Sequence, residues 1–171
     1  SAHMDMGQGC YNGIATLVAE ELGADWTQMD VVGGWGNIPL YGNLTWGGVA
    51  QGTGGSSAMA SSFDRYRKAG ATARAQLVGA ASLRWKLPVD ELRVVDGVVS
   101  HASGPSAHFG ELAVAAAATP SGTVTLKASK DWKLIGRPLW SWPMACALQP
   151  PIRPSTNGFT SLPHRRPRPN G

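Results

Sequence analysis

Residues 51–85 read QGTGGSSAMASSFDRYRKAGATARAQLVGAASLRW, and this stretch decides the fold. Apolar and small side chains recur at helical spacing from about Ser56 to Trp85, and the many alanines favour a helix. Ser56 or Ser57 can cap the first turn, and Pro88 prevents the helix from continuing. The sequence therefore predicts one long central helix that follows a glycine-rich loop.

The segments on both sides of this helix complete an α+β fold class. An apolar repeat ending at Gly23 predicts the first helix, and an Asp-Gly pair at 96–97 predicts a β-hairpin. Ser106 is the expected cap of a short later helix. The expected elements are a helix at Cys10–Leu22, a strand at 27–32, a hairpin at 92–100, a helix at 109–118 and a strand at 123–127.

The charge of the chain is low and uneven. Charged residues make up 15% of the sequence, below the ~25% of ordinary soluble domains. The formal net charge of +4 equals the contribution of Arg153, Arg165, Arg166 and Arg168, and residues 149–171 contain no acidic side chain. The neutral remainder argues against nucleic-acid binding. The apolar runs are far shorter than the ~20 residues that a membrane span needs.

We expect three parts along the chain. Residues 1–4 are interpreted as a cloning scar and no signal peptide is recognised, residues 5–139 as the ordered domain, and residues 140–171 as a Pro/Arg-rich tail that is non-native, disordered or extended. The two cysteines, Cys10 and Cys146, are expected to be free thiols.

Two glycine turns, at 7–9 and 54–57, each open a predicted helix and are the strongest candidates for a binding site. Unpaired amides at a helix N-terminus attract anions, and glycines let a phosphate come close. The second turn lacks the lysine of a Walker loop and the spacing of the Rossmann fingerprint. If both rows of amides point to one place, they can hold a common negatively charged ligand, although either can be a plain turn. The candidate cofactor-binding residues are Gly7, Gln8, Gly9, Gly54, Gly55, Ser56 and Ser57.

Other polar residues predict no catalytic or metal site. No His/Cys cluster has metal-ligand spacing, and the Gly-x-Ser-x-Gly elbow of hydrolases does not occur. His101 and His108 are expected in surface loops, and at least one of Glu20 and Glu21 is expected in solvent. The solvated face of the long helix is expected to carry Arg65, Arg67, Lys68 and Arg74, with Asp64 as a local partner.

Four stretches of the sequence, in the same order, resemble the xanthine dehydrogenase/aldehyde oxidase family. They are DMGQG at 5–9 with YNGIATLVAEEL at 11–22, QGTGGSSA at 51–58 with SFDRYRKAGA at 62–71, DGVVSHASG at 96–104, and KDWKLIG at 130–136. The branch that they resemble is the molybdopterin-binding large subunit of the isoquinoline 1-oxidoreductase and membrane-bound aldehyde dehydrogenase type. The resemblance covers about residues 5–139.

The resemblance implies an enzyme that hydroxylates aldehydes or N-heterocycles with oxygen from water. Its cofactor would be molybdenum on molybdopterin cytosine dinucleotide, and a separate iron–sulfur subunit would remove the electrons. By this resemblance Gly7, Gln8 and Gly9 lie against the pterin and metal end. The turn at 54–57 contacts the phosphates or the pterin.

The sequence also departs from this family. Its members run to several hundred residues and carry a catalytic glutamate in a Gly-Glu-Ala-Gly-like motif that these 171 residues lack. The expectation is a fragment that is inactive alone, binds no cofactor by itself and self-associates through exposed apolar surface. Two alternatives stay open. One is a small non-catalytic module for a phosphate-bearing ligand or an acidic partner, and the other is a structural piece without activity.

Overall fold

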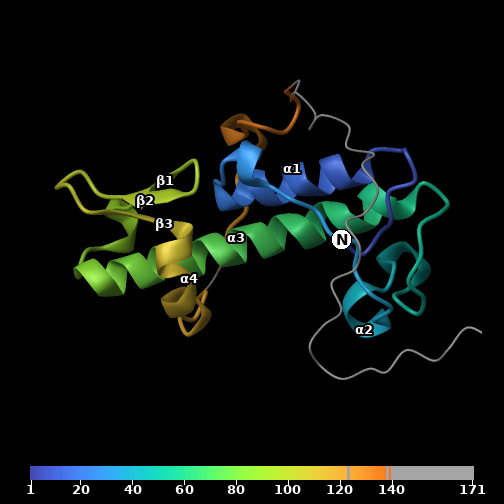
Figure 1. Ribbon diagram of the computed structural model, residues 1–171, viewed down its shortest axis with the longest axis horizontal. Coiled ribbons are helices and arrows are strands. Elements are labelled where there is room, and N and C mark those ends of the chain that lie inside the picture. Colours follow the sequence, from blue (N-terminus) through green and yellow to red (C-terminus); the bar gives the residue numbers. More distant parts are fainter. Residues whose placement is uncertain (123, 138, 140–171) are drawn as a thin grey trace, which may run out of the picture. The chain divides into compact units, whose positions relative to one another are not determined.

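Two helices of very different length, α1 (Cys10–Leu22) and α3 (Ser57–Trp85), run side by side in the same direction (Figure 1). The computed structural model describes residues 1–122, 124–137 and 139, all of which lie in one unit, Ser1–Leu139. Among these residues no helix is both long and apolar enough to cross a bilayer. Because the two helices are parallel, both N-termini lie at the same end of the pair.

The bounds of these helices follow from local signals. The helix α1 has the predicted bounds, and Gly23 caps it in the left-handed region at φ 75°, with its N–H donating to the Ala19 carbonyl. The helix α3 begins one residue after Ser56, which has a φ of 53° and no side-chain capping bond. The long helix after a glycine-rich loop is therefore confirmed.

Small residues let α1 and α3 approach closely. A Cβ atom built on Gly70 would lie 2.7 Å from the Val18 carbonyl oxygen and 3.2 Å from Glu21 Cβ. Ala15 and Ala19 of α1 are buried, as is Ala71 of α3. The alanines and glycine of the long helix thus serve a backbone-to-backbone contact that a larger side chain would prevent.

A three-stranded antiparallel sheet and α4 (Phe109–Ala117) pack on the second half of α3. The strands β1 (Arg93–Val95) and β2 (Val98–Ser100) form the predicted hairpin, with Val94 opposite Val99 and a turn at 96–97 whose two φ values are positive. The core beneath them contains Leu77, Val78, Ala80, Ala81, Leu92, Val99, Ala107, Leu112 and Ala116.

The third strand was not predicted, and it changes the start of α4. The strand β3 (Ser106–His108) pairs with β2, so Ser106 lies opposite Ser100 and is not a helix cap. His108 caps α4 instead, and its N–H donates to Glu111 Oε1 at 2.8 Å. The α+β class is confirmed, with one more strand than the sequence showed.

Two segments expected to be strands are not strands. Within 27–32 the chain makes a 3-10 turn at Trp26–Gln28, because the Asp25 side chain accepts the Thr27 N–H. Residues 124–127 pair with no strand. Position 123 and the predicted tail at 140–171 lie outside the described residues.

The glycine-rich loop is ordered by short turns and by the first residues of the chain. It contains α2 (Ile38–Tyr41) and a 3-10 turn at Leu44–Trp46. The Ser1 carbonyl accepts the Gly34 N–H at 2.6 Å, and Ala2 and His3 are buried. Residues 1–3 therefore pack against this end of the domain.

Candidate functional site

The two predicted glycine turns lie at the same end of the helix pair. The N–H of Met4, just before the first turn, donates to Thr53 Oγ1 at 2.7 Å. His3 Nδ1 lies 3.1 Å from the Gly52 carbonyl oxygen. The positive ends of both helix dipoles therefore face the same side of the protein, as the sequence hypothesis requires.

The first turn is already occupied by a carboxylate of the chain. Asp5 Oδ1 accepts the N–H groups of Gly7 at 2.8 Å and Gly9 at 3.4 Å, and its Oδ2 accepts that of Tyr11 at 3.0 Å. Burial opposes the charge of Asp5, but these three donors outweigh it and lower the pKa of the carboxyl group. The expectation of unpaired amides at Gly7 and Gly9 is therefore wrong.

The Gln8 side chain is also engaged within the turn. Its Oε1 accepts the Met6 N–H at 2.6 Å, and its Nε2 donates to the Met4 carbonyl at 3.0 Å. The local signal for this arrangement is Asp5, because an aspartate two residues before a glycine commonly accepts the N–H of that glycine in an Asx-turn. Asp5 was not among the predicted site residues.

Removing Asp5 should free these amides. We expect Asp5→Ala to lower the free energy of unfolding by about 1 kcal/mol, the usual cost of losing a helix cap. Inorganic phosphate should then raise the melting temperature of the variant more than that of the parent chain, because the vacated donors can bind an anion. Thermal unfolding followed by circular dichroism measures both. Asp64→Ala, at an exposed position of α3, is the control, and an equal phosphate effect in all three proteins would contradict the prediction.

The second turn is open. Gly55 and Ser56 are exposed and have φ values of 59° and 53°. A Cβ atom on Gly55 would meet nothing within 4 Å. Among the described residues, no side chain caps Ser56 and no carboxylate accepts a hydrogen bond from this turn. The positive end of a 29-residue helix is therefore available to a ligand.

Buried groups fix the shape of this open turn from below. Asn43 Nδ2 donates to Ser57 Oγ at 2.6 Å, and Ser57 Oγ donates to the Gly54 carbonyl at 2.6 Å. Ser57 is buried, and its hydroxyl makes hydrogen bonds within the fold. Ser56 is exposed, and its hydroxyl makes no capping hydrogen bond. The Trp46 ring lies under the turn, so close that a Cβ atom on Gly52 would be 2.8 Å from it. Asn43 was not among the predicted site residues, because it lies 14 residues before Ser57 in the sequence.

Glu20 and Glu21 form the most buried charged cluster of the described chain. Both are 1% exposed, so the expectation that one is solvated is wrong. Glu20 Oε2 accepts the backbone N–H groups of Lys133, Leu134 and Ile135 at 2.8, 2.6 and 3.2 Å. Its Oε1 lies 3.1 Å from Lys127 Nζ. The segment 127–135 thus covers the end of α1 and satisfies its carboxylates.

Arg67 neutralises the second carboxylate. Its Nε and Nη2 lie 2.8 and 2.7 Å from Glu21 Oε1, and Nη2 also donates to the Lys127 carbonyl at 2.7 Å. The guanidinium carbon lies 5.2 and 5.3 Å from the ring centroids of Phe63 and Trp132. Arg67 is buried, so its expected place on a solvated helix face is wrong.

The other basic residues of α3 differ from one another. Arg65 donates to the carbonyls of Leu40 at 2.6 Å and Gly42 at 3.1 Å, which ties the glycine-rich loop to the helix. Lys68 is exposed, as expected, and Arg74 is half-buried. The Glu20, Glu21, Arg67 and Lys127 cluster is therefore structural, because all of its charges are paired inside the fold.

The Glu20 contacts predict acid sensitivity. Burial alone would raise the pKa of this carboxyl, but the hydrogen bonds from Leu134, Lys127 and their neighbours outweigh it and lower the pKa below the ordinary 4.5. The unfolded chain then binds the proton first as the pH falls. The stabilisation is complete above about pH 4.5 and is lost as the pH falls through the folded-state pKa. Urea unfolding across this range should show a shallower pH dependence for Glu20→Gln than for the parent, and an unchanged one for Asp64→Asn, a change at an exposed position. Parallel curves for all three would contradict it.

The histidines carry no metal-site geometry. His101 Nε2 lies 2.9 Å from Glu91 Oε2, and His108 is the cap of α4. Within residues 1–122, 124–137 and 139, no three His, Cys, Asp or Glu side chains are grouped so that they could hold a metal ion.

Comparisons with a family model and with two relatives point to the same protein family. Residues 1–150 match the family model of the molybdopterin cofactor-binding domain. The chain is 42% identical over 111 residues to the beta subunit of isoquinoline 1-oxidoreductase from Brevundimonas diminuta, a match that covers 64% of this chain and 14% of that protein. It is 33% identical over 140 residues to the B subunit of nicotinate dehydrogenase from Pseudomonas putida (strain KT2440), covering 80% of this chain and 11% of that protein. The chain thus spans about an eighth of the length of these relatives.

Proposed function

Because the chain belongs to the molybdopterin cofactor-binding domain family, in the xanthine dehydrogenase/aldehyde oxidase group of large subunits, we propose that its open turn at 54–57 holds an anionic group of a molybdopterin cofactor. One observation supports this most directly. The turn combines the free N-terminus of a 29-residue helix with a glycine at φ 59° beside which there is open space. Phosphate groups are bound in this way elsewhere, by backbone N–H groups and a helix dipole.

The residues of this turn would have separate roles. The backbone N–H groups of Gly55 and Ser56, together with the exposed Ser56 hydroxyl, would donate to the anionic group. Gly54 and Ser57 would keep the turn in shape through the Asn43 contacts. When bound, the cofactor supplies the metal centre for an oxidative hydroxylation with oxygen from water. We further propose the cytosine dinucleotide form, of which the open turn would hold one phosphate, while donors in other parts of the parent protein would hold the other.

The first turn would contribute differently. The N–H groups of Gly7 and Gly9 are given to Asp5, so Gly7, Gln8 and Gly9 cannot act as a row of free donors. Gly7 and Gly9 are exposed, with open space beside each Cα. We propose that the cofactor packs directly against these two glycines, which have no side chain. The N–H groups of the second turn would then bind the negatively charged group of the cofactor.

We also propose that these 171 residues do not catalyse turnover alone. The chain contains four glutamates, and each is described. Glu20 and Glu21 are held in the buried cluster, Glu91 pairs with His101, and Glu111 accepts the His108 N–H. Every glutamate thus has a structural partner. The catalytic base and the electron-transfer partner, which we propose to be an iron–sulfur subunit, would belong to other parts of the assembly.

The test is retention of the cofactor. The chain should be purified from a host that makes molybdopterin cytosine dinucleotide and analysed for molybdenum by mass spectrometry and for cytidine nucleotide by chromatography. Ser56→Glu places a carboxylate at the open turn, where it should occupy the N–H groups and compete with the anion. Ser129→Glu, at another exposed serine, is the matched control.

Because the isolated chain carries only part of the site, we expect the parent chain and the Ser129→Glu variant to retain both components weakly, below one equivalent, and Ser56→Glu to lose them, with equal melting temperatures for the three proteins free of cofactor. Equal retention by Ser56→Glu would place the cofactor contact elsewhere in the chain. Absence of both components from the parent would reject the proposal for the isolated domain.

Exposed apolar side chains favour self-association of the isolated chain. The glycine-rich loop exposes Trp35, Ile38, Leu40, Leu44, Trp46 and Val49. Such a patch is typical of an interface. We expect the mass from light scattering to rise with protein concentration. The double variant Trp35→Ser/Leu40→Ser should reduce this rise, while Leu83→Ser, at the other end of α3, should not. A monomer at every concentration would contradict the prediction.

A further inference from the structure

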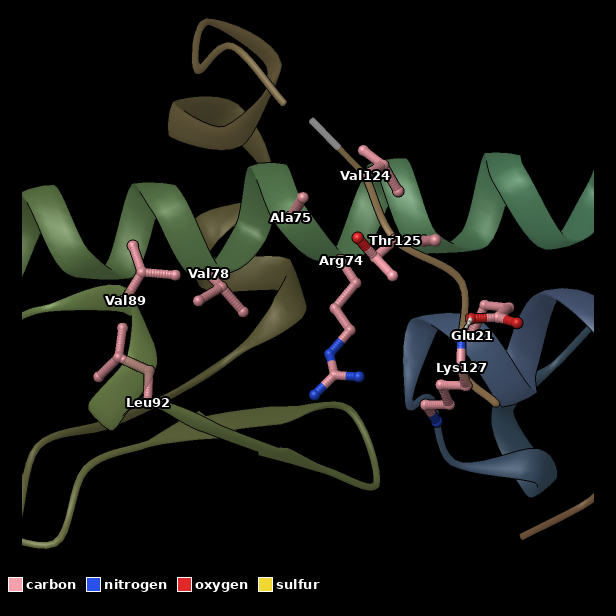
Figure 2. A pocket seen from close by; sticks show the side chains of 10 residues that line it. Glu21, Arg74, Ala75, Val78, Val89, Leu92, Val124, Thr125 and Lys127 are labelled. Atoms are coloured by element: carbon pink, nitrogen blue, oxygen red, sulfur yellow. Dashed lines mark hydrogen bonds between the residues drawn. The ribbon is translucent and has the colours of Figure 1, made fainter. Parts of the chain in front are cut away.

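A cavity of about 240 Å³ lies along the middle of α3 (Figure 2), and none of the residues that line it belongs to either glycine turn. It is bounded by α3, by the 3-10 turn at Val89–Glu91 with Leu92, and by residues 124–127. Its residues belong to none of the contacts proposed for the cofactor. Whatever binds there is therefore a separate ligand.

One cation of this cavity has no partner among the residues that the structure describes. Three charged residues line the cavity, namely Glu21, Arg74 and Lys127. The Glu21 carboxylate is paired with Arg67, and Lys127 Nζ is paired with Glu20. Arg74 makes no hydrogen bond or ion pair with another described residue, and Figure 2 shows its side chain extending from α3 across the cavity. The cavity therefore carries one net positive charge.

The wall beside this charge is apolar. Val78 and Leu92 are buried core residues, and Val89 completes the same side of the cavity. Ala71 and Ala75 of α3 form the floor without filling the space. A ligand here would meet a guanidinium at one end and branched aliphatic side chains at the other, which is the arrangement of small-molecule sites with one polar group that fixes orientation.

We propose that this cavity binds a small organic monocarboxylate, with its carboxylate on Arg74 and its apolar body on Val78, Val89 and Leu92. The guanidinium fork matches a carboxylate in bidentate geometry. The Arg74 guanidinium can balance one negative charge on a ligand. A second negative charge on the same ligand would be repelled by the nearby Glu21 carboxylate. The volume is below the ~300 Å³ at which drug-sized sites begin, so a ring or a short branched chain fits and a dinucleotide does not.

The test is a titration of the isotope-labelled full chain, followed by two-dimensional NMR. Benzoate is the probe, and benzamide is its neutral counterpart of the same shape. Arg74→Met removes the charge while keeping most of the side-chain volume. Arg84→Met, at an exposed position of the same helix, is the matched control, and Arg74→Lys keeps the charge but loses the fork.

We expect benzoate to shift the amide signals of residues 74–78, 89–92 and 124–127. Arg74→Met and the change to benzamide should each weaken binding about tenfold or more, the usual worth of a charge-assisted hydrogen bond. Arg74→Lys should give an intermediate affinity, and Arg84→Met should have no effect. The comparison of benzoate with benzamide on the parent chain does not depend on how any variant folds.

Three results would overturn the proposal. Benzoate and benzamide could bind equally, benzoate could bind equally to Arg74→Met, or benzoate could shift none of these signals. In the last case, loss of concentration-dependent mass in Arg74→Met would assign the guanidinium to a carboxylate of a second copy. None of these results bears on the open turn at 54–57, so the two proposals fail independently.

Discussion

Arg67→Met should lower the free energy of unfolding by about 3–5 kcal/mol, the cost expected when one partner of a buried ion pair is removed. Glu21 is 1% exposed, and Arg67 donates one of the two hydrogen bonds that its carboxylate accepts and places Nη2 2.7 Å from the same oxygen as an ion pair. The same variant removes the donor to the Lys127 carbonyl and the cation between Phe63 and Trp132. The charge left behind would be buried and uncompensated.

Urea unfolding monitored by circular dichroism measures this loss. Arg84→Met, the same chemical change at an exposed site of α3, should be within about 0.5 kcal/mol of the parent. The double variant Arg67→Met/Glu21→Leu should be more stable than Arg67→Met alone, because no unpaired charge then remains. If Arg67→Met behaved like Arg84→Met, the cluster would not hold the domain together.

Gly70→Ala should destabilise the protein by about 1–3 kcal/mol through overpacking. A Cβ atom at this position would lie 2.7 Å from the Val18 carbonyl oxygen. That atom belongs to the α1 backbone, so the contact can be relieved only by moving the two helices apart. The expected effect is opposite in sign to that of helix propensity alone, because replacing glycine with alanine inside a helix ordinarily stabilises a protein by up to about 1 kcal/mol.

The matched control is Gly110→Ala. Gly110 lies in α4, and a Cβ atom there would meet nothing within 4 Å. The control should therefore be stabilised or unchanged, so that the same substitution has opposite signs at two helical positions. Thermal unfolding of the two variants decides this, and a stabilised Gly70→Ala would show that the close approach of α1 and α3 is not required.

The parts of the fold that the sequence predicted are those governed by local physics. The bounds of α1 follow from its apolar spacing and from Gly23, and the hairpin follows from an Asp-Gly pair with positive φ values. The two strand predictions that failed rest on composition alone. At 27–32 the Asp25 side chain pairs with the backbone, and at residue 127 the N–H donates to Glu21, so neither segment has a neighbouring strand.

The features of the candidate site also separate into those that local sequence predicts and those that depend on distant residues. Both glycine turns are helix starts, as predicted, but their availability depends on other residues. Asp5 closes the first turn from two residues away, a local pattern that the sequence displays. Asn43 shapes the second turn from 14 residues away, which periodicity cannot show. The location of the turns could therefore be predicted, whereas the difference between them could not.

The large sequence separation between Glu20 and its hydrogen-bond partners has a consequence for synthesis on the ribosome. The Glu20 carboxylate accepts the N–H of Leu134, which lies 114 positions later in the sequence. The partner of Glu21, Arg67, lies 46 positions after it. A chain that emerges from its N-terminus has both charges in place long before their partners exist. The two carboxylates of the first helix must then stay hydrated until residues 127–135 have left the exit tunnel. We therefore expect the slowest step of folding to be the closure of this loop, because contacts so distant along the chain form late.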